Sequence, residues 1–386
     1  MRILARLFAI LVLAPVLSPA SAPATTPGRA AAIDRVVEAE LGKAKANGLA
    51  VAIVEHGQVV RVRCYGTRNV RGDPLTPQSI MYGASLTKAV FAYTVMRLAD
   101  EGKVAQDEPI AAMLSKPLPD YGNLDKYGNW GDLAGDSRWR KLTPRILLSH
   151  AGGFANFSFL EPDQKLRFHF EPGGRYAYSG EGLILLQFAI EQRLGHGFEE
   201  DAQRLAFRPL GMTDSSLHWQ DRFAGRLADG WQVDGTAILH DRRDNVRVAG
   251  SMDTTIADMA KFASALVTGV GLSQASHQAM LAPQLPITTA TQFPTLQSEV
   301  PQARRVAGLA AGLGVVVFDG PQGRGFYKGG HDDQTGNVMV CLRQGQRCVV
   351  LLGNDVRAER AFPAIVKAVL GDTGVPWQWE YGIQQP

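Results

Sequence analysis

The sequence lacks several features that would point to particular classes of protein. Only three cysteines occur in 386 residues, and their spacing predicts neither a disulfide-rich scaffold nor a zinc site. The 40 basic and 37 acidic residues nearly balance, and no basic run occurs, so we expect no nucleic acid partner. The motifs H-E-x-x-H and G-x-S-x-G are both absent, which argues against a zinc protease and an α/β-hydrolase. We therefore expect no metal and no cofactor.

Apolar stretches long enough to cross a membrane are also missing near the N-terminus. The run Leu7–Leu17 follows Arg2 and Arg6 and leads into small residues that would suit cleavage after Ala20 or Ala22. A spanning helix needs about twenty apolar residues, so this pattern is typical of a secretory signal. We expect residues 1–22 to be removed and the protein to be exported to the periplasm or secreted, without a stable membrane anchor. A short helix of the folded domain is the alternative.

Two of the cysteines fit an exported protein. Cys341 and Cys348 flank Gln344-Gly345 in a run that looks like a β-hairpin, and counting from that turn places them opposite each other. Opposed strand residues are close enough for a disulfide, although two buried free thiols fit the pattern equally well. Cys64 is left over, and we expect it to be buried.

Hydrophobic periodicity predicts strands at both ends of the chain and helices between them. Ala30–Ala46 has helical spacing, and Leu49–Val54 with Val59–Cys64 reads as a hairpin. The run Leu86–Ala99 is apolar on nearly every side, which indicates a buried helix. The remaining predictions are helices at Pro144–His150, Leu183–Leu194, Glu199–Ala206, Thr255–Thr268 and Arg360–Leu370, and strands at Val315–Phe318, Val338–Leu342 and Val349–Leu352.

This order predicts an α+β fold in which one antiparallel sheet is assembled from both ends of the chain and flanked by helices. We expect residues 30–84 and 211–386 to form the sheet lobe. Residues 85–210 would form an inserted, mainly helical lobe, with the active site at the junction between the two.

A candidate nucleophile lies where a glycine-containing loop enters the predicted buried helix. Ser85-Leu86-Thr87-Lys88 is the only S-x-x-K in the chain. Residues three apart share a helix face, so the amine of Lys88 can reach the hydroxyl of Ser85. Burial lowers the pKa of an ammonium, and the neutral amine can then act as a general base. The alternative is an ordinary helix N-cap followed by a surface lysine.

The chain resembles the penicillin-recognising serine hydrolases, which include class C β-lactamases, D-alanyl-D-alanine carboxypeptidases, D-aminopeptidases and esterases. The resemblance runs from about Ala50 to Asp355 and implies a β-lactamase/transpeptidase-like fold. It is carried by segments in family order: Tyr82–Lys88 with Leu98–Lys103, Leu147–Phe154, Pro172–Ser179, Pro209–Thr213 and Ala249–Met252.

The resemblance implies that Ser85 is the acylated nucleophile, Lys88 its base and Tyr178 the second proton-transfer group. A phenol beside an ammonium can lose a proton more readily, because the positive charge favours the phenolate. Tyr176 is a rival, since alternation along a strand would place both tyrosines on one face.

A third element of the family is a lysine or histidine on an edge strand beside the nucleophile. We favour His331, followed by Thr335-Gly336, over the competing register that begins at Lys328. In that register the backbone N–H groups of Ser85 and Gln334 would form the oxyanion hole. A loop histidine without a catalytic role is the alternative.

Two departures from the family pattern affect the expected substrate. Gly180 stands where the family has a substrate-binding asparagine, and Asp332 and Asp333 follow His331 where small residues are usual. Alternation predicts that Asp333 points to the same side as His331, and Asp332 to the other. Added carboxylates would repel a substrate carboxylate, so we expect weak activity on β-lactams and D-Ala-D-Ala peptides.

We therefore expect a serine hydrolase that forms an acyl-enzyme with a small ester, an amide or a D-amino-acid peptide. The alternatives are a true β-lactamase or D,D-carboxypeptidase, and a non-catalytic sensor of cell-wall fragments. A metal site at His331-Asp332-Asp333 is a more distant one. Specificity is expected in the loops Pro117–Arg140 and Phe154–Pro172. Their aromatic residues either line an apolar pocket or pack the lobe: Trp130, Trp139, Phe154, Phe157, Phe159, Phe168 and Phe170.

Overall fold

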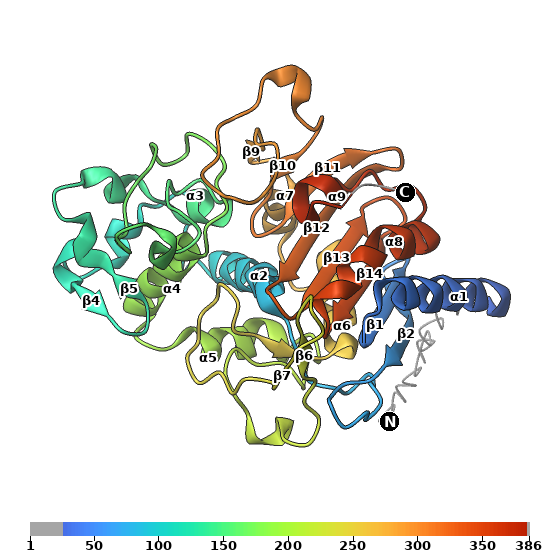
Figure 1. Ribbon diagram of the computed structural model, residues 1–386. Helices are drawn as coiled ribbons and strands as arrows, with labels where there is room; N and C mark the ends of the chain where they lie inside the picture. The colour runs from blue at the N-terminus through green and yellow to red at the C-terminus, as the bar shows by residue number, and fades with distance from the viewer. Residues whose placement is uncertain (1–25, 384–386) are drawn as a thin grey trace, which may run out of the picture.

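The computed structural model describes residues 26–383 and is built around one large antiparallel sheet with helices on both faces (Figure 1). The predicted leader lies outside the described residues. In spatial order the strands are β2 (Gln58–Gly66), β1 (Gly48–Glu55), β14 (Arg347–Gly353), β13 (Gly336–Leu342), β12 (Gly323–His331), β11 (Val316–Gly320), β10 (Ala310–Ala311) and β9 (Leu285–Pro286). The N-terminal hairpin therefore pairs with strands from the C-terminal third, as the sequence predicts.

Alternating side chains give the sheet two buried faces. In β1, Leu49, Val51 and Ile53 belong to the cluster beneath α1 (Pro27–Ala44) and α8 (Phe362–Leu370). The side chains between them belong to the cluster on the opposite face. That cluster includes α2 (Thr87–Asp100) and α6 (Ile256–Thr268). Because both faces are covered, these strands read as continuous apolar runs.

The helical part of the chain lies on the far side of α2 from the large sheet (Figure 1). Its helices are α3 (Pro144–Leu148), α4 (Gly180–Leu194) and α5 (Phe198–Ala202), which continues into a π-helical turn, Gln203–Phe207. The rings of Phe91 in α2 and Phe198 in α5 meet edge to face, with centroids 4.8 Å apart. α2 is thus covered on nearly all sides, in agreement with its apolar character.

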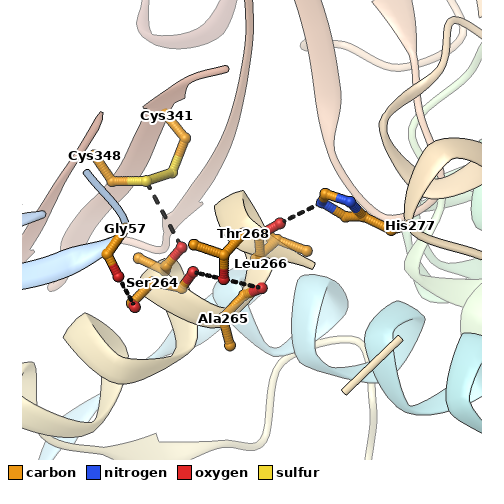
Figure 2. The surroundings of a disulfide bond; sticks show 9 residues. Gly57, Ser264, Ala265, Leu266, Thr268, His277, Cys341 and Cys348 are labelled. Atoms are coloured by element: carbon orange, nitrogen blue, oxygen red, sulfur yellow. Dashed lines mark hydrogen bonds between the residues drawn. A yellow bond between two sulfur atoms is a disulfide. The ribbon is translucent and has the colours of Figure 1, made fainter. Parts of the chain in front are cut away.

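The predicted hairpin of the C-terminal region is β13–β14, and Cys341 faces Cys348 in it. The two cysteines form a disulfide, with Cα atoms 4.1 Å apart. Figure 2 shows the bond lying against α6, where the Cys348 sulfur is 3.7 Å from the Ala263 carbonyl oxygen. Cys64 is only partly buried, contrary to expectation.

Several elements were not predicted from the sequence. β12 has the sequence GRGFYKGGH, in which four glycines and the absence of β-branched residues give a loop-like pattern. The helices α7 (Gln274–Leu281) and α9 (Trp377–Tyr381) are short. Three pairs of short strands were also not predicted: β3 (Met81–Tyr82) with β8 (Asp253–Thr254), β4 (Asn123–Leu124) with β5 (Gly128–Asn129), and β6 (Gly230–Trp231) with β7 (Ala237–Ile238). Between residues 26 and 383, no helix combines the length and apolarity that a membrane span requires.

Candidate active site

Ser85 lies in a 3-10 turn, Ala84–Leu86, immediately before α2. The preceding residue, Ala84, has a φ of 45°, a left-handed conformation that is uncommon for a residue with a side chain. The turn is tied to the segment before β8, because the Gly83 N–H donates to the Met252 carbonyl at 2.9 Å. The turn places Ser85 in the lining of a cavity of about 870 Å³.

Lys88 is almost completely buried and lies beside this hydroxyl, as the three-residue spacing predicts. Its Nζ is 2.9 Å from Ser85 Oγ and also donates to the Ala249 carbonyl. Burial, together with the charge of Lys328, holds the pKa of Lys88 well below its usual value. A neutral amine at this position can accept the proton of the serine hydroxyl.

Tyr178 is the tyrosine that faces the lysines. Its ring centroid is 4.9 Å from Lys88 Nζ, whereas the hydroxyl of Tyr176 bonds to Gln292 at 3.0 Å and lies outside the cavity lining. Burial raises the pKa of Tyr178, although its hydrogen bond with Ser85 opposes this. The phenol therefore stays protonated near neutral pH, and the expected preference for phenolate is outweighed by burial.

The segment that carries His150 holds Tyr178 in place. The His150 carbonyl accepts the Ala177 N–H at 2.8 Å, and its ring lies 4.5 Å from the Tyr178 ring. The Ser179 N–H donates to His150 Nδ1 at 3.1 Å. Burial and two nearby lysines keep the pKa of His150 well below its usual value, so the ring is a neutral support.

The structure favours Lys328 over His331 as the cation beside Tyr178. Lys328 is buried on β12, with Nζ 3.4 Å from the Tyr178 hydroxyl, and burial lowers its pKa to about 8 despite the opposing charge of Glu380. His331 also lines the cavity, but its Nδ1 is 3.0 Å from a Glu359 carboxylate oxygen. Although burial opposes protonation, the contact with Glu359 raises the pKa of His331.

The strand backbone next to these residues lies directly against the nucleophile turn. A Cβ added at Gly330 would be 2.8 Å from the Leu86 backbone nitrogen and 2.9 Å from the Gly83 carbonyl oxygen. The Asp332 N–H donates back to the Thr335 carbonyl at 3.1 Å. The backbone at the end of β12, which includes His331, therefore lies beside the turn that carries Ser85.

Three sequence-based assignments do not agree with this geometry. The Gln334 N–H donates to Asp332 Oδ1 at 3.0 Å, so it is not free to serve an oxyanion hole. Asp333 is exposed and accepts from Gln232 at 2.8 Å, while Asp332 lines the cavity, the reverse of the expected orientation. The reason is that β12 ends at His331, and strand alternation does not continue into the turn.

Gly180, expected to contact the substrate, is the third assignment that disagrees with the geometry. It lies outside the cavity lining, because the ring of Phe157 covers it: an added Cβ would be 2.5 Å from two ring carbons. The Gly180 N–H donates to Asn156 Oδ1 at 3.0 Å, and Asn156 lines the cavity. The carboxamide in this region therefore comes from a preceding loop, a placement that sequence spacing alone does not reveal.

The cavity wall combines aromatic and charged side chains. Of the aromatic residues expected there, Phe157 and Phe159 line it, whereas Trp130 and Trp139 are buried in the core. Other lining residues come from segments that sequence reasoning did not assign to the site: Asp241, Arg242, Arg243, Asp244, Asn245, Arg247, Phe293 and Glu380. The fold brings the charged segment 241–247 together with Phe293 and Glu380, which are distant from it in the sequence.

No group of three or more His, Cys, Asp or Glu side chains in residues 26–383 is arranged to hold a metal ion. The candidate set at His331-Asp332-Asp333 is dispersed, since His331 pairs with Glu359 and Asp333 turns away to Gln232.

Comparison with known proteins places the chain in a family. Esterase EstB of Burkholderia gladioli is 26% identical over 221 residues, which cover 52% of this chain and 55% of EstB. A D-aminopeptidase of Gluconobacter oxydans is 25% identical over 194 residues, covering 50% of this chain and 37% of that protein. The matched region thus spans less than two thirds of the length of these curated relatives.

The fold is matched more completely than the sequence. The D-alanine carboxypeptidase AmpC of Burkholderia cenocepacia superposes with a TM-score of 0.69 at 15% identity, covering 89% of this chain and all of that one. The β-lactamase/transpeptidase-like fold is therefore confirmed. The Beta-lactamase family model matches residues 33–370, nearly the whole described chain. This protein belongs to the beta-lactamase family.

Proposed function

We propose that the protein is a serine hydrolase that forms an acyl-enzyme with an ester or amide. The observation that carries this proposal is the 2.9 Å approach of Lys88 Nζ to Ser85 Oγ in the lining of a large open cavity. An amine whose pKa is lowered by burial is suited to take the hydroxyl proton.

The acylation step follows from the placement of these groups. As the Ser85 Oγ–H bond breaks, the proton passes to Lys88 Nζ and Oγ bonds to the substrate carbonyl carbon. The bond from that carbon to the leaving oxygen or nitrogen then breaks, and the Tyr178 phenol supplies a proton to the leaving group. The proton on Lys88 returns to the tyrosine oxygen. Water then attacks the acyl carbon, the bond from that carbon to Ser85 Oγ breaks, and a proton from the water passes through Tyr178 and Lys88 to Oγ, which releases the acid and restores Ser85.

The developing oxyanion needs donors in place before the reaction. We propose the backbone N–H groups of Ser85 and His331, in place of the Gln334 group expected from sequence. The close contact of Gly330 with the nucleophile turn supports this pairing. Loss of one such donor typically lowers kcat by about 100- to 1,000-fold.

The substrate is proposed to be a small ester or amide, since Phe157, Phe159 and Phe293 make part of the cavity apolar. Esterase and D-aminopeptidase relatives support the same range. A β-lactamase or D,D-carboxypeptidase is less well supported, because Phe157 covers Gly180 and Asp332 faces the cavity.

The test is turnover and covalent labelling of Ser85→Ala. We expect the variant to lose p-nitrophenyl acetate hydrolysis and labelling by a fluorophosphonate probe. Ser115→Ala, which changes an exposed serine away from the cavity, should retain both. Parallel assays with nitrocefin and a D-alanine amide distinguish the substrate classes. Full labelling of Ser85→Ala would rule the proposal out, and binding without turnover by the unmodified protein would favour a sensor.

We also propose that the protein is exported. The pattern of residues 1–22 and the disulfide in the β13–β14 hairpin support this, because such bonds persist in oxidising compartments. N-terminal sequencing of protein from a periplasmic fraction should begin after Ala20 or Ala22. Cytosolic protein that retains Met1 would contradict the proposal.

A further inference from the structure

Exposed apolar side chains gather at the mouth of the Ser85 cavity. Phe159 and Phe293 line it and are 59% and 38% exposed, and the neighbouring Leu160 is 62% exposed. Exposing large apolar groups costs free energy, and a cluster of them beside a cavity marks a binding surface. The other large exposed apolar side chains of the described residues lie outside this region: Val59, Val70, Val233, Leu239, Val270 and Val306.

A second cavity of about 210 Å³ adjoins the first. Asn156 and Phe293 line both cavities, so the two share a wall. Phe293 belongs to the loop between β9 and β10, drawn in orange at the top of Figure 1, and its ring lies 5.5 Å from that of Tyr178. Phe293 therefore extends an apolar surface from beside Tyr178 to the second cavity.

The lining of the second cavity is poorly suited to bind a charged ligand. Most of its lining is apolar, from Ala155, Leu160, Phe293, Pro294 and Leu296. Its one ionisable lining residue, Glu161, already bonds to His169. The charged segment 241–247 lines the first cavity and not the second. A ligand group that extends here gains mainly from burial of apolar surface.

We propose that these two cavities form one groove for an extended apolar chain of the substrate, so that the enzyme prefers medium-chain esters to acetates. This inference rests on the proposed function and names its substrate class. The apolar chain of the substrate belongs either to its acyl group or to its alcohol. In both cases Phe293 and Leu160 would contact the same kind of alkyl chain. Each methylene that enters the groove should raise kcat/KM by about two- to fourfold.

The experiment measures kcat/KM for two ester series with the full-length protein. One series is p-nitrophenyl esters from acetate to dodecanoate, and the other is acetate esters of alcohols from ethanol to dodecanol. We expect kcat/KM to rise steadily with chain length in one series and to level off once the chain is longer than the second cavity can hold. A rise in the acyl series places the chain on the acyl side, and a rise in the alcohol series places it on the leaving group.

The variant Leu160→Asp puts a charge into the second cavity at a position exposed enough to tolerate it. We expect the ratio of octanoate to acetate kcat/KM, or its alcohol counterpart, to fall at least tenfold. Leu239→Asp makes the same change at a residue that is 70% exposed and lines neither cavity, and it should keep the ratio of the unmodified protein.

A flat profile in both series, with activity still dependent on Ser85, would overturn the groove while leaving the hydrolase proposal intact. An unchanged ratio in Leu160→Asp would also overturn it. Ser85-independent hydrolysis would instead defeat the proposed function itself. These results are distinguishable, because the Ser85→Ala control accompanies every substrate.

Discussion

Replacing Gly330 by alanine tests the close contact between β12 and the nucleophile turn. The added methyl would lie 2.8 Å from the Leu86 backbone nitrogen and 2.9 Å from the Gly83 carbonyl oxygen, whereas ordinary contacts begin at 3.4 Å. The strand and the turn must therefore separate by about 0.6 Å or more, the difference between 3.4 and 2.8 Å. Both neighbours are backbone atoms, so no side-chain rotation can relieve the contact.

This separation acts on stability and on the proposed oxyanion site. Overpacking of this kind costs about 1 to 3 kcal/mol of unfolding free energy. It also moves the His331 N–H away from Ser85, and a displacement near 1 Å can lower a rate about 100-fold. We expect Gly330→Ala to fold with a reduced thermal midpoint and to lose most of its kcat/KM for p-nitrophenyl acetate.

Gly42→Ala is the matched control, because Gly42 is exposed in α1 and an added Cβ there meets no atom within 4 Å. It should leave activity unchanged and stabilise the protein by about 0.5 to 1 kcal/mol. The reasoning would be refuted if Gly330→Ala kept kcat/KM within about threefold of the unmodified enzyme at a temperature where both are folded.

Three further predictions concern the surroundings of this contact. Lys328→Met removes a charge that lowers the pKa of Lys88, so the acid limb of the kcat/KM profile should move to higher pH, while Lys328→Arg should leave it in place. Gly180→Asn should lower the thermal midpoint because Phe157 occupies the space, and adding Phe157→Ala should restore it. Reduction of the hairpin disulfide should lower the free energy of unfolding by about 2 to 3 kcal/mol in a denaturant titration.

The parts of the fold that sequence reasoning predicted are those with strong local patterns. The hairpin of β1 and β2 has apolar runs on both sides of His56-Gly57, and both turn residues have positive φ. α2 is long and apolar all round, so its existence and burial followed directly. The approach of Ser85 to Lys88 is likewise local, since the two residues lie three apart, where the 3-10 turn leads into α2.

What the sequence could not predict depends on contacts between distant segments. β12 has glycines where a strand normally has branched residues, and at Gly330 the reason is the close approach of the backbone to the turn that carries Ser85. Lys328 lies in the glycine-rich part of that strand, and from the sequence it was only the competing register behind His331. Phe157 covers Gly180 from a separate loop, and Asn156 bonds to it from the same loop. Neither residue has a sequence signal that identifies its partner.

Glycine in place of asparagine at position 180 and the proposed groove beyond Phe293 both make the surroundings of Tyr178 more apolar. An asparagine at position 180 would place a polar amide beside the catalytic groups, but here the ring of Phe157 fills that space and stacks on Phe159 with centroids 5.1 Å apart. The wall next to Tyr178 is thus apolar on the sides of both Phe157 and Phe293. In the proposed groove, burial of apolar surface would contribute more than hydrogen bonds, and chain length would be discriminated gradually, by the free energy of each buried methylene.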